Sequence, residues 1–409
     1  MEPLLITPDK ALEIILKHTP TLEKERIPLL ASTGRVLGND IVANISIPPF
    51  DNSAMDGYAL HALDSRDATA SSPVFLPIRG EIQAGGGLQA YPLEKGTAVR
   101  IMTGAPVPPS ADSVIQFEDT EESEGSVKLF RRVAPGENIR RAGEDIRPGQ
   151  RVLEIGVRLR AADVGLLASL NHQEIEAYRM PKVAIISTGD EIADPGEEMR
   201  PGQIRNSNAY TLMSEISRYA IPVYLGIARD NRDATRELFL KAMDCDAVIT
   251  TGGVSMGRYD FVKDVMHDMG IEIFIENILM KPGKPCVFGK RKQTLFFGLP
   301  GNPVSTLVSF IQFVRPALLR LMGAARISKP VVKARLLEDI RKKAGRTHYI
   351  RGYFSLQNGE WHVTSTGPQG SGILRSMSEA NCLIILPQEM TKAGMGDLVD
   401  IQLIHHDEI

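Results

Sequence analysis

The chain has 409 residues, of which 43% are hydrophobic, and a formal net charge of −3. This length predicts about two to four packed domains, and the apolar content means that disorder is not the expected state. The nearly balanced charge argues against a protein that binds nucleic acid along its whole length. The three cysteines, Cys245, Cys286 and Cys382, are too scattered for a disulfide framework or a structural zinc site, and we expect them to be small buried side chains.

The first predicted element is a short amphipathic helix. Thr7 followed by Pro8 is typical of a helix N-cap with proline at the first helical position. Leu12, Ile15 and Leu16 then place apolar side chains on one face of the helix. The chain starts without a basic leader, and no stretch approaches the roughly 20 apolar residues that a membrane span needs. We therefore expect a soluble, cytoplasmic protein.

From about residue 45 to residue 150 the sequence alternates between short apolar runs and turns rich in proline and glycine. This pattern is typical of an all-β insertion with long loops. Asp56 lies there in a segment of mixed polarity, and Asp145 lies in an acidic turn near the end of the insertion. A helix is expected next, over residues 161–170.

Three short apolar runs, each followed by a Gly-rich polar turn, are the strongest signal in the sequence. The runs are residues 183–186, 247–249 and 295–297, and the turns that follow them are residues 187–191, 250–255 and 298–303. Runs of this kind, separated by helical stretches, predict buried parallel strands. Since ligands of such sheets bind at the carboxyl ends of the strands, we expect the turns to converge on one crevice.

The last predicted elements are a long helix and a small β domain. Asn302 is placed as the N-cap, and Pro303 at the first position, of a helix that runs toward Met322. Beyond it, Asn358-Gly359 between two alternating runs predicts a hairpin with a type I′ turn. We therefore expect an α/β plus β chain. Its parts are an N-terminal linker and helical domain (1–45 and 146–178), an inserted β domain (46–145), a three-layer α/β domain (179–327) and a C-terminal β domain (328–409).

The turns of the α/β domain carry chemistry suited to anions. A helix N-terminus offers unpaired N–H groups, so the start at Asn302 is either an anion site or simply a well-capped helix. Lys281 and Lys284 lie on a Pro- and Gly-rich turn before the last strand. They are either phosphate-binding point charges or an exposed basic turn.

Four carboxylates in turns favour a divalent cation. Glu191 follows the first strand of the α/β domain, Asp260 follows the second turn, and Asp56 and Asp145 lie in the β insertion. Acidic groups beside phosphate-binding groups fit a bridging Mg²⁺, although each alone also fits a solvated turn or a helix cap. The absence of Walker A, GxGxxG and HExxH motifs argues against ordinary ATPases, dinucleotide enzymes and zinc hydrolases.

Six motifs stand in order along the chain, at residues 51–59, 101–105, 187–191, 252–257, 281–285 and 298–303. Together they resemble the MoeA family, the molybdopterin molybdenumtransferases, whose eukaryotic relative is the C-terminal part of gephyrin. The resemblance spans about residues 7–405 and implies an elongated subunit of four domains, with a MogA-like α/β domain, that forms a homodimer.

The resemblance also implies the last step of molybdenum cofactor synthesis. In that step adenylylated molybdopterin and molybdate give the cofactor and AMP with a divalent cation, usually Mg²⁺. Other proteins of cofactor synthesis are a further class of partner, whereas no nucleic acid or membrane is expected as a partner.

The resemblance assigns functions to particular residues. The candidate catalytic residues are Asp56, Asp145, Glu191 and Asp260, and the candidate metal ligands are Glu191 and Asp260. The candidate substrate-binding residues are Thr103, Ser187, Thr188, Gly189, Asp190, Asp230, Gly252, Gly253, Val254, Ser255, Lys281, Lys284, Pro300, Gly301, Asn302, Pro303 and Ser371.

Within this set, the amides of residues 252–255 and the helix start at 302–303 would hold the phosphate end of the pterin. Lys281, Lys284 and Ser371 would draw in molybdate. Residues of the β insertion would approach from the partner subunit.

One position departs from the family pattern, because Asn277 stands four residues before Lys281, where members often carry a basic residue. Three other interpretations stay open. MogA-type adenylyltransferases and CinA-type hydrolases share the α/β domain but not the long β insertion, and a scaffold of the gephyrin kind would lack the acidic residues that are intact here. No residue pattern separates molybdate from tungstate.

Overall fold

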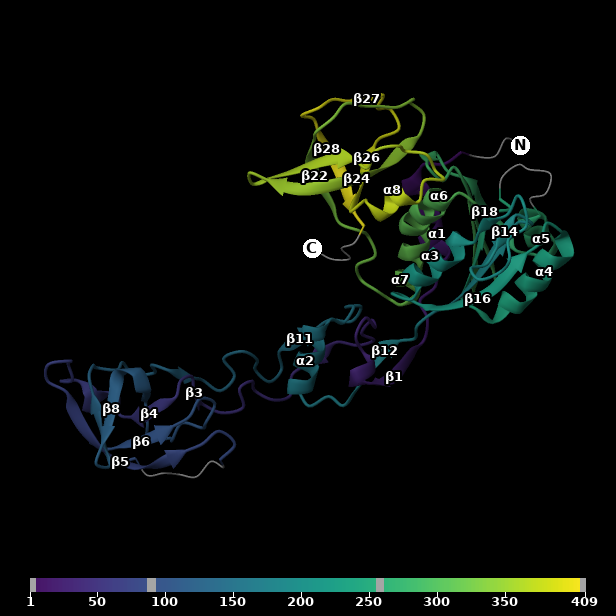
Figure 1. Cartoon of the computed structure of the whole chain (residues 1–409). Helices are drawn as coiled ribbons and strands as arrows, with labels where there is room; N and C mark the ends of the chain where they lie inside the picture. The colour runs from purple at the N-terminus through teal and green to yellow at the C-terminus, as the bar shows by residue number, and fades with distance from the viewer. Residues whose placement is uncertain (1–4, 87–92, 255–260, 405–409) are drawn as a thin grey trace. The chain divides into compact units, whose positions relative to one another are not determined.

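The computed structural model describes residues 5–86, 93–254 and 261–404, which fall into two compact units (Figure 1). The larger unit comprises Met1–Asn39, Ile155–Ala161 and Glu174–Ile409, and the smaller unit comprises Asp40–Glu154 and Ala162–Gln173. Along the sequence, the smaller unit is thus inserted into the larger one.

A six-stranded sheet forms the centre of the larger unit. Its strand order is β16 (Ile221–Ala228), β13 (Lys182–Thr188), β17 (Ala247–Thr251), β21 (Thr294–Leu299), β20 (Pro285–Arg291) and β18 (Glu272–Asn277). The first four strands are parallel, and β20 and β18 extend the sheet in antiparallel fashion. The three apolar runs of the sequence are therefore neighbouring parallel strands, as predicted.

Alternate residues of the central strands enter two separate cores. Val183 and Ile185 of β13 belong to the core on one face, whereas Ala184 and Ile186 belong to the core on the other. A strand that is apolar at every position is buried on both faces, because successive side chains point in opposite directions. Four helices cover the first face, namely α1 (Pro8–His18), α3 (Ser207–Ile216), α6 (Pro303–Ser309) and α7 (Arg315–Leu321). Two helices cover the second face, namely α4 (Arg232–Lys241) and α5 (Val262–Asp268) (Figure 1).

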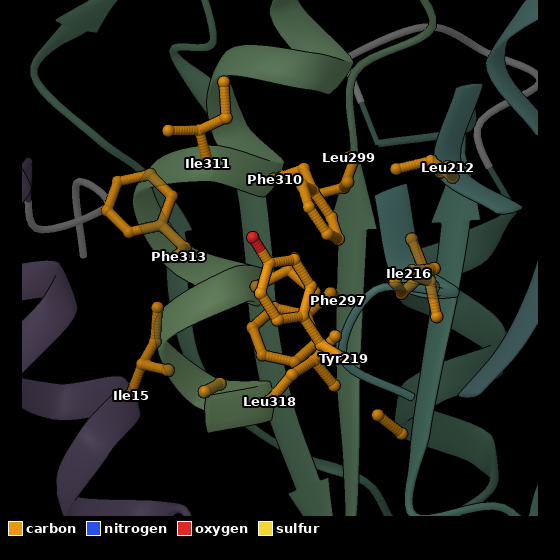
Figure 2. Close-up of a cluster of buried hydrophobic side chains, with 14 of the residues drawn as sticks. Ile15, Leu212, Ile216, Tyr219, Phe297, Leu299, Phe310, Ile311, Phe313 and Leu318 are labelled. Carbon is orange, nitrogen blue, oxygen red and sulfur yellow. The ribbon is translucent and has the colours of Figure 1, made fainter. Parts of the chain in front are cut away.

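The helical run Pro303–Leu321 is the main helix of the first core. It consists of α6, the π-helical segment η5 (Phe310–Val314) and α7. The predicted continuous helix is interrupted by this π turn where Pro316 has no N–H for the carbonyl four residues earlier. Figure 2 shows Phe310 and Leu318 of the run around Phe297 of β21. The run is long and apolar enough to cross a membrane by composition, but 83% of its most apolar window is buried inside the protein.

The N-terminal segment forms the predicted helix. Thr7 Oγ1 accepts a hydrogen bond from the Lys10 N–H at 3.3 Å, and Pro8 is the first residue of α1. After it, β1 (Lys24–Pro28) pairs with β12 (Glu174–Tyr178), and η1 (Leu29–Ala31) follows β1. The smaller elements of the α/β region are β14 (Ile192–Ala193), β15 (Ile204–Arg205) and η4 (Ala242–Asp244).

The C-terminal β domain is a closed sheet. Its strands are β22 (Val331–Leu336), β24 (Thr347–Gln357), β25 (Glu360–Ser365), β26 (Cys382–Leu386) and β28 (Leu398–Leu403), with β23 (Ile340–Arg341), β27 (Lys392–Ala393) and α8 (Arg375–Ser378) beside them. The sheet closes because β24 pairs with both β25 and β26. β19 (Met280–Lys281) from the α/β domain also pairs with β24. Asn358 and Gly359 both have positive φ (52° and 82°), which confirms the predicted type I′ turn.

The smaller unit is built mainly from strands, as the sequence predicts. Its sheet has the order β7 (Ser113–Gln116), β4 (Gly57–Leu60), β6 (Ala98–Ile101), β5 (Val74–Ile82), β9 (Ser126–Leu129) and β8 (Thr120–Ser123). Two short ribbons pair β3 (Asn52–Ser53) with β10 (Ile139–Arg140) and β2 (Ile41–Val42) with β11 (Arg151–Leu153). The helical segments are η2 (Ala62–Ser65), η3 (Phe117–Asp119) and α2 (Ala161–Ser169), the last of which was predicted.

Candidate functional site

The turns that follow β13, β17 and β21 line one cavity of about 390 Å³, which we name the strand-end pocket. From these turns come Thr188, Gly189, Glu191, Thr251, Gly252, Gly253, Gly301, Asn302 and Pro303, and from other segments come Ile192, Ile204, Arg205, Asn206, Ser207, Asn208 and Asp230. The predicted convergence of the three turns on one crevice is therefore confirmed. Glycine-rich turns and helix starts present backbone N–H groups, which suit an anion.

Gly252 permits the close approach of two of these turns. Its φ is +92°, and a Cβ at this position would lie 2.7 Å from Thr188 Oγ1, so glycine alone fits without a shift. The Gly252 N–H donates to the Leu299 carbonyl at 2.9 Å, and the Thr188 hydroxyl donates to the Thr251 carbonyl at 3.1 Å. These bonds tie the ends of the three strands together.

The start of α3 forms a wall of this pocket that the sequence analysis missed. Asn206 is the N-cap: its Oδ1 accepts a backbone N–H of the first turn at 3.3 Å, and its amide donates to Asp194 at 2.8 Å. The buried Ser187 hydroxyl donates to the same Oδ1 at 3.0 Å, so Ser187 lies behind the wall and not in the lining. Asn208 donates to the Gly301 carbonyl at 2.8 Å and joins α3 to the third turn. The signal for this wall was an asparagine before an apolar helical run, a common N-cap.

Three carboxylates lie in or beside the strand-end pocket, since Glu191 and Asp230 line it and Asp190 lines an adjoining cavity. The Asp190 N–H donates to the Asp230 carboxylate and the Asp230 N–H to the Asp190 carboxylate, each at 3.3 Å. Asp190 lines an adjoining cavity of about 530 Å³ together with Arg229, and Glu191 lines both cavities. Among the described residues, no three His, Cys, Asp or Glu side chains are grouped to hold a metal ion. A cation bound here would need ligand phosphates to complete its shell.

A second cavity, of about 900 Å³, is lined by the turn 281–285 and by the C-terminal β domain, and we name it the basic pocket. It brings together five of the predicted residues, Lys281, Lys284, Pro300, Asn302 and Ser371. It also includes the loop 341–346, with Arg341, Lys342, Lys343 and Arg346, which the sequence analysis missed. A run of four cations in six residues was the available signal, but nothing local indicated that it lies opposite residues 281–285.

The two acidic residues of the basic pocket are already engaged. Glu338 accepts hydrogen bonds from the Thr364 hydroxyl at 2.8 Å and from the Ser365 N–H at 2.5 Å. Asp339 forms an ion pair with Lys392 at 3.0 Å. The cations of the pocket are therefore in excess.

Arg351 holds the loop that carries Ser371. Its side chain is 1% exposed, its Nε donates to Ser376 Oγ at 3.0 Å, and a terminal nitrogen donates to the Gly370 carbonyl at 3.0 Å. Burial lowers the pKa of Arg351 to about 10, so the group stays charged at neutral pH. The Ser371 carbonyl accepts the Val304 N–H at 3.0 Å, which fastens the loop to the start of α6.

Asn302 lines both pockets. It stands at the N-cap position of α6 with Pro303 in the first turn, as predicted, but its side chain makes no capping hydrogen bond. The Thr306 hydroxyl instead donates to the Pro300 carbonyl at 2.6 Å and stabilises the turn. The exposed Asn302 side chain therefore lies at the junction of the two cavities.

In the smaller unit the structure brings Asp56 and Thr103 together. One carboxylate oxygen of Asp56 accepts both the N–H of Thr103 at 2.6 Å and its hydroxyl at 2.8 Å. These hydrogen bonds hold the pKa of Asp56 below its ordinary value. Asp145 is exposed, and its N–H donates to the Ile47 carbonyl at 3.1 Å.

Two predicted residues, Ser255 and Asp260, lie outside the described residues. Val254, which precedes them, is buried in the second core and is not part of either lining. Gly298 makes room for it, since a Cβ at Gly298 would lie 2.5 Å from Val254 Cγ1.

Comparison with known proteins agrees with this arrangement over nearly the whole chain. Residues 6–171 match the "MoeA N-terminal region (domain I and II)", residues 184–320 a "Probable molybdopterin binding domain", and residues 333–404 the "MoeA C-terminal region (domain IV)". The crystal structure of a molybdopterin biosynthesis MoeA protein from Pyrococcus horikoshii is similar, with a TM-score of 0.82 and 32% identity over 98% of this chain and 100% of that one.

Named relatives are similar over their full length. The molybdopterin molybdenumtransferase of Haemophilus influenzae is 37% identical over 408 residues, which cover 98% of this chain and 99% of the relative. The enzyme of the same name from Nostoc is 36% identical over 403 residues, covering 95% and 92%. This chain therefore belongs to the MoeA family of molybdopterin molybdenumtransferases.

Proposed function

We propose that this enzyme inserts molybdate into adenylylated molybdopterin, which forms the molybdenum cofactor and releases AMP. The observation that carries the proposal is that the strand-end pocket and the basic pocket share Asn302 as a lining residue. One cavity suits the phosphates of a nucleotide-linked pterin and the other suits an oxyanion. Their common wall is where the two substrates would meet.

The strand-end pocket is proposed to hold the phosphates of the pterin substrate. The Gly253 amide supplies an N–H group, and the helix start at Pro303 adds partial positive charge. The Gly252 N–H is already bonded to the Leu299 carbonyl and positions this turn. Glu191 and Asp260 are proposed to place the water that splits the phosphoanhydride. Water attack on this bond yields AMP and the pterin monophosphate.

The basic pocket is proposed to bind molybdate through Lys281, Lys284 and Ser371. Two ammonium groups balance the two negative charges of the tetrahedral oxyanion, and the serine hydroxyl donates a hydrogen bond to it. Tungstate has the same shape and charge, so it would occupy the same groups.

Mg²⁺ is the proposed cofactor, and the donor set fits it. Glu191 and Asp230 place hard oxygen ligands on the strand-end pocket, Asp260 is a further proposed ligand, and substrate phosphates would complete the shell. When bound, the cation would neutralise phosphate charge.

The enzyme is further proposed to act as a homodimer in the cytoplasm. Asp56, Thr103 and Asp145 of the partner subunit would complete each site, a role supported by the hydrogen-bonded pair that Asp56 and Thr103 already form. The three cysteines are free and buried, which agrees with a reducing compartment.

Pocket-specific variants test the proposal in a steady-state assay of AMP release. Lys281→Gln should raise the KM for molybdate about tenfold through the lost charge, with the KM for adenylylated molybdopterin unchanged. Asn208→Ala, which removes the 2.8 Å bond to Gly301, should raise the KM for the pterin substrate alone. Lys333→Gln is the matched control, since Lys333 pairs with Asp400 outside both pockets.

The outcomes separate the alternatives. A scaffold would bind the pterin substrate without AMP release, and an adenylyltransferase would consume ATP to make that substrate. Either result would overturn the transferase. If both variants raised the same KM, the assignment of one substrate to each pocket would be wrong.

A further inference from the structure

His348 is a titratable side chain of the basic pocket, and the proposed reaction gives it no role. It is half-buried, lines the pocket, and is the second residue of β24. In the parallel pairing of β19 with β24 it is the register partner of Lys281, so the two side chains emerge side by side on one face. In the described part of the chain, no hydrogen bond engages the His348 ring.

The titratable groups that line the pocket together with His348 are mostly cationic. They are Lys281 and Lys284 from the turn 281–285, Arg341, Lys342, Lys343 and Arg346 from the loop 341–346, Arg351 and Tyr349 from its own strand, and Glu338 and Asp339. Both carboxylates are engaged elsewhere, by Ser365 and Lys392 respectively. Lys342 is held in place because its Nζ donates to the Arg346 carbonyl at 2.9 Å and to the Gln388 carbonyl at 3.2 Å.

We propose that His348 binds the oxyanion substrate directly and takes up a proton when it does so, which couples oxyanion binding to proton uptake. This inference rests on the proposed function, since it concerns the oxyanion pocket of that reaction. It names the ligand class as a tetrahedral dianion. A dianion stabilises a protonated histidine among cations more strongly than a monoanion does.

The charge state of the free pocket supports the coupling. Burial, then Lys342, Lys281 and Arg346, lower the pKa of His348 to about 4, so the ring is neutral at physiological pH. A bound dianion offsets these cations and favours the protonated ring, which moves its pKa back toward the ordinary value of 6.5. By linkage, a group whose pKa rises on binding makes the complex tighter as pH falls through the higher pKa. A return to the ordinary value would make affinity about tenfold higher at about pH 5.5 than at about pH 8.

Titration calorimetry with sodium molybdate and the full-length protein measures both quantities. Wild-type protein should show the tenfold rise in affinity. In two buffers of different ionisation enthalpy at about pH 5.5 it should take up close to one proton per molybdate. His348→Gln keeps a neutral hydrogen-bond donor, so it should bind as wild type does at about pH 8, within about threefold, and lose the pH dependence and the proton uptake.

Controls keep the inference falsifiable. His362→Gln is the matched control, because His362 lies on β25 of the same domain, outside the pocket. It should retain the wild-type pH dependence. His348→Asn provides a second neutral side chain if the glutamine variant folds poorly. Unchanged pH dependence in folded His348→Gln would overturn the inference and leave the transferase intact. A wild-type protein that neither binds molybdate nor releases AMP would overturn both.

Discussion

The substitution Gly252→Ala probes how closely the turns of the strand-end pocket must approach. A Cβ at Gly252 would lie 2.7 Å from Thr188 Oγ1 and 3.1 Å from the Thr188 carbonyl oxygen, and the residue has a φ of +92°. The backbone conformation costs a non-glycine residue about 1–2 kcal/mol. Displacing Thr188 also weakens its bond to the Thr251 carbonyl, worth about 1 kcal/mol. The free energy of unfolding should therefore fall by about 2–3 kcal/mol.

Gly396→Ala separates the two contributions. Gly396 has a nearly identical φ of +90°, but a Cβ there would meet nothing within 4 Å. This variant should lose only the conformational part, about 1–2 kcal/mol, and should bind substrate normally. Both glycines belong to the larger unit, so urea unfolding followed by circular dichroism compares them directly.

The functional consequence should differ as well. Gly252→Ala moves the neighbouring Gly253 amide that we propose to bind phosphate, so the KM for adenylylated molybdopterin should rise by at least about tenfold. Steady-state AMP release measures it. If Gly252→Ala matched Gly396→Ala in stability and wild type in KM, the close contact between the turns would not position the phosphate site.

Three further predictions concern stability, thiol chemistry and assembly. Asp246 accepts two hydrogen bonds from Arg179, both at 2.8 Å. Burial raises the pKa of Asp246, but the interaction with Arg179 outweighs burial. The pKa of Asp246 therefore lies below its ordinary value of 3.8. Asp246→Asn should cost about 2 kcal/mol at neutral pH by urea unfolding, a loss that should shrink once pH falls below the unfolded-state pKa and vanish below the folded pKa. Burial raises the pKa of Cys286 and of Cys382 to about 12. Iodoacetamide at about pH 8 should therefore leave the native protein unlabelled and should label all 3 cysteines after denaturation, which mass spectrometry measures. Mixing inactive Asp56→Asn and Glu191→Gln subunits should restore about a quarter of wild-type AMP release if sites are shared between subunits, and none if each subunit supplies its own Asp56.

The sequence predicted the elements whose signals are local. The three apolar runs became β13, β17 and β21 because strands buried on both faces need apolar residues at every position. Thr7-Pro8 and Asn358-Gly359 marked a helix start and a turn through their own backbone chemistry.

The parts of the candidate site that sequence reasoning missed depend on distant contacts. His348 meets Lys281 only because β24 pairs with β19, and no pattern within residues 341–351 indicates that pairing. Asn302 has the identity and position of an N-cap, but its side chain makes no capping hydrogen bond and lines two cavities instead. Tertiary structure, not local helix propensity, determines this placement. The π turn before Pro316 likewise replaces a helix that periodicity alone predicts to be regular.

Single-turnover release of AMP from adenylylated molybdopterin, with and without molybdate, tests the central claim most directly. With the two substrates held in pockets that meet at Asn302, we predict one AMP released per cofactor formed and essentially none without the oxyanion. AMP release at the same rate in the absence of molybdate or tungstate would contradict the account.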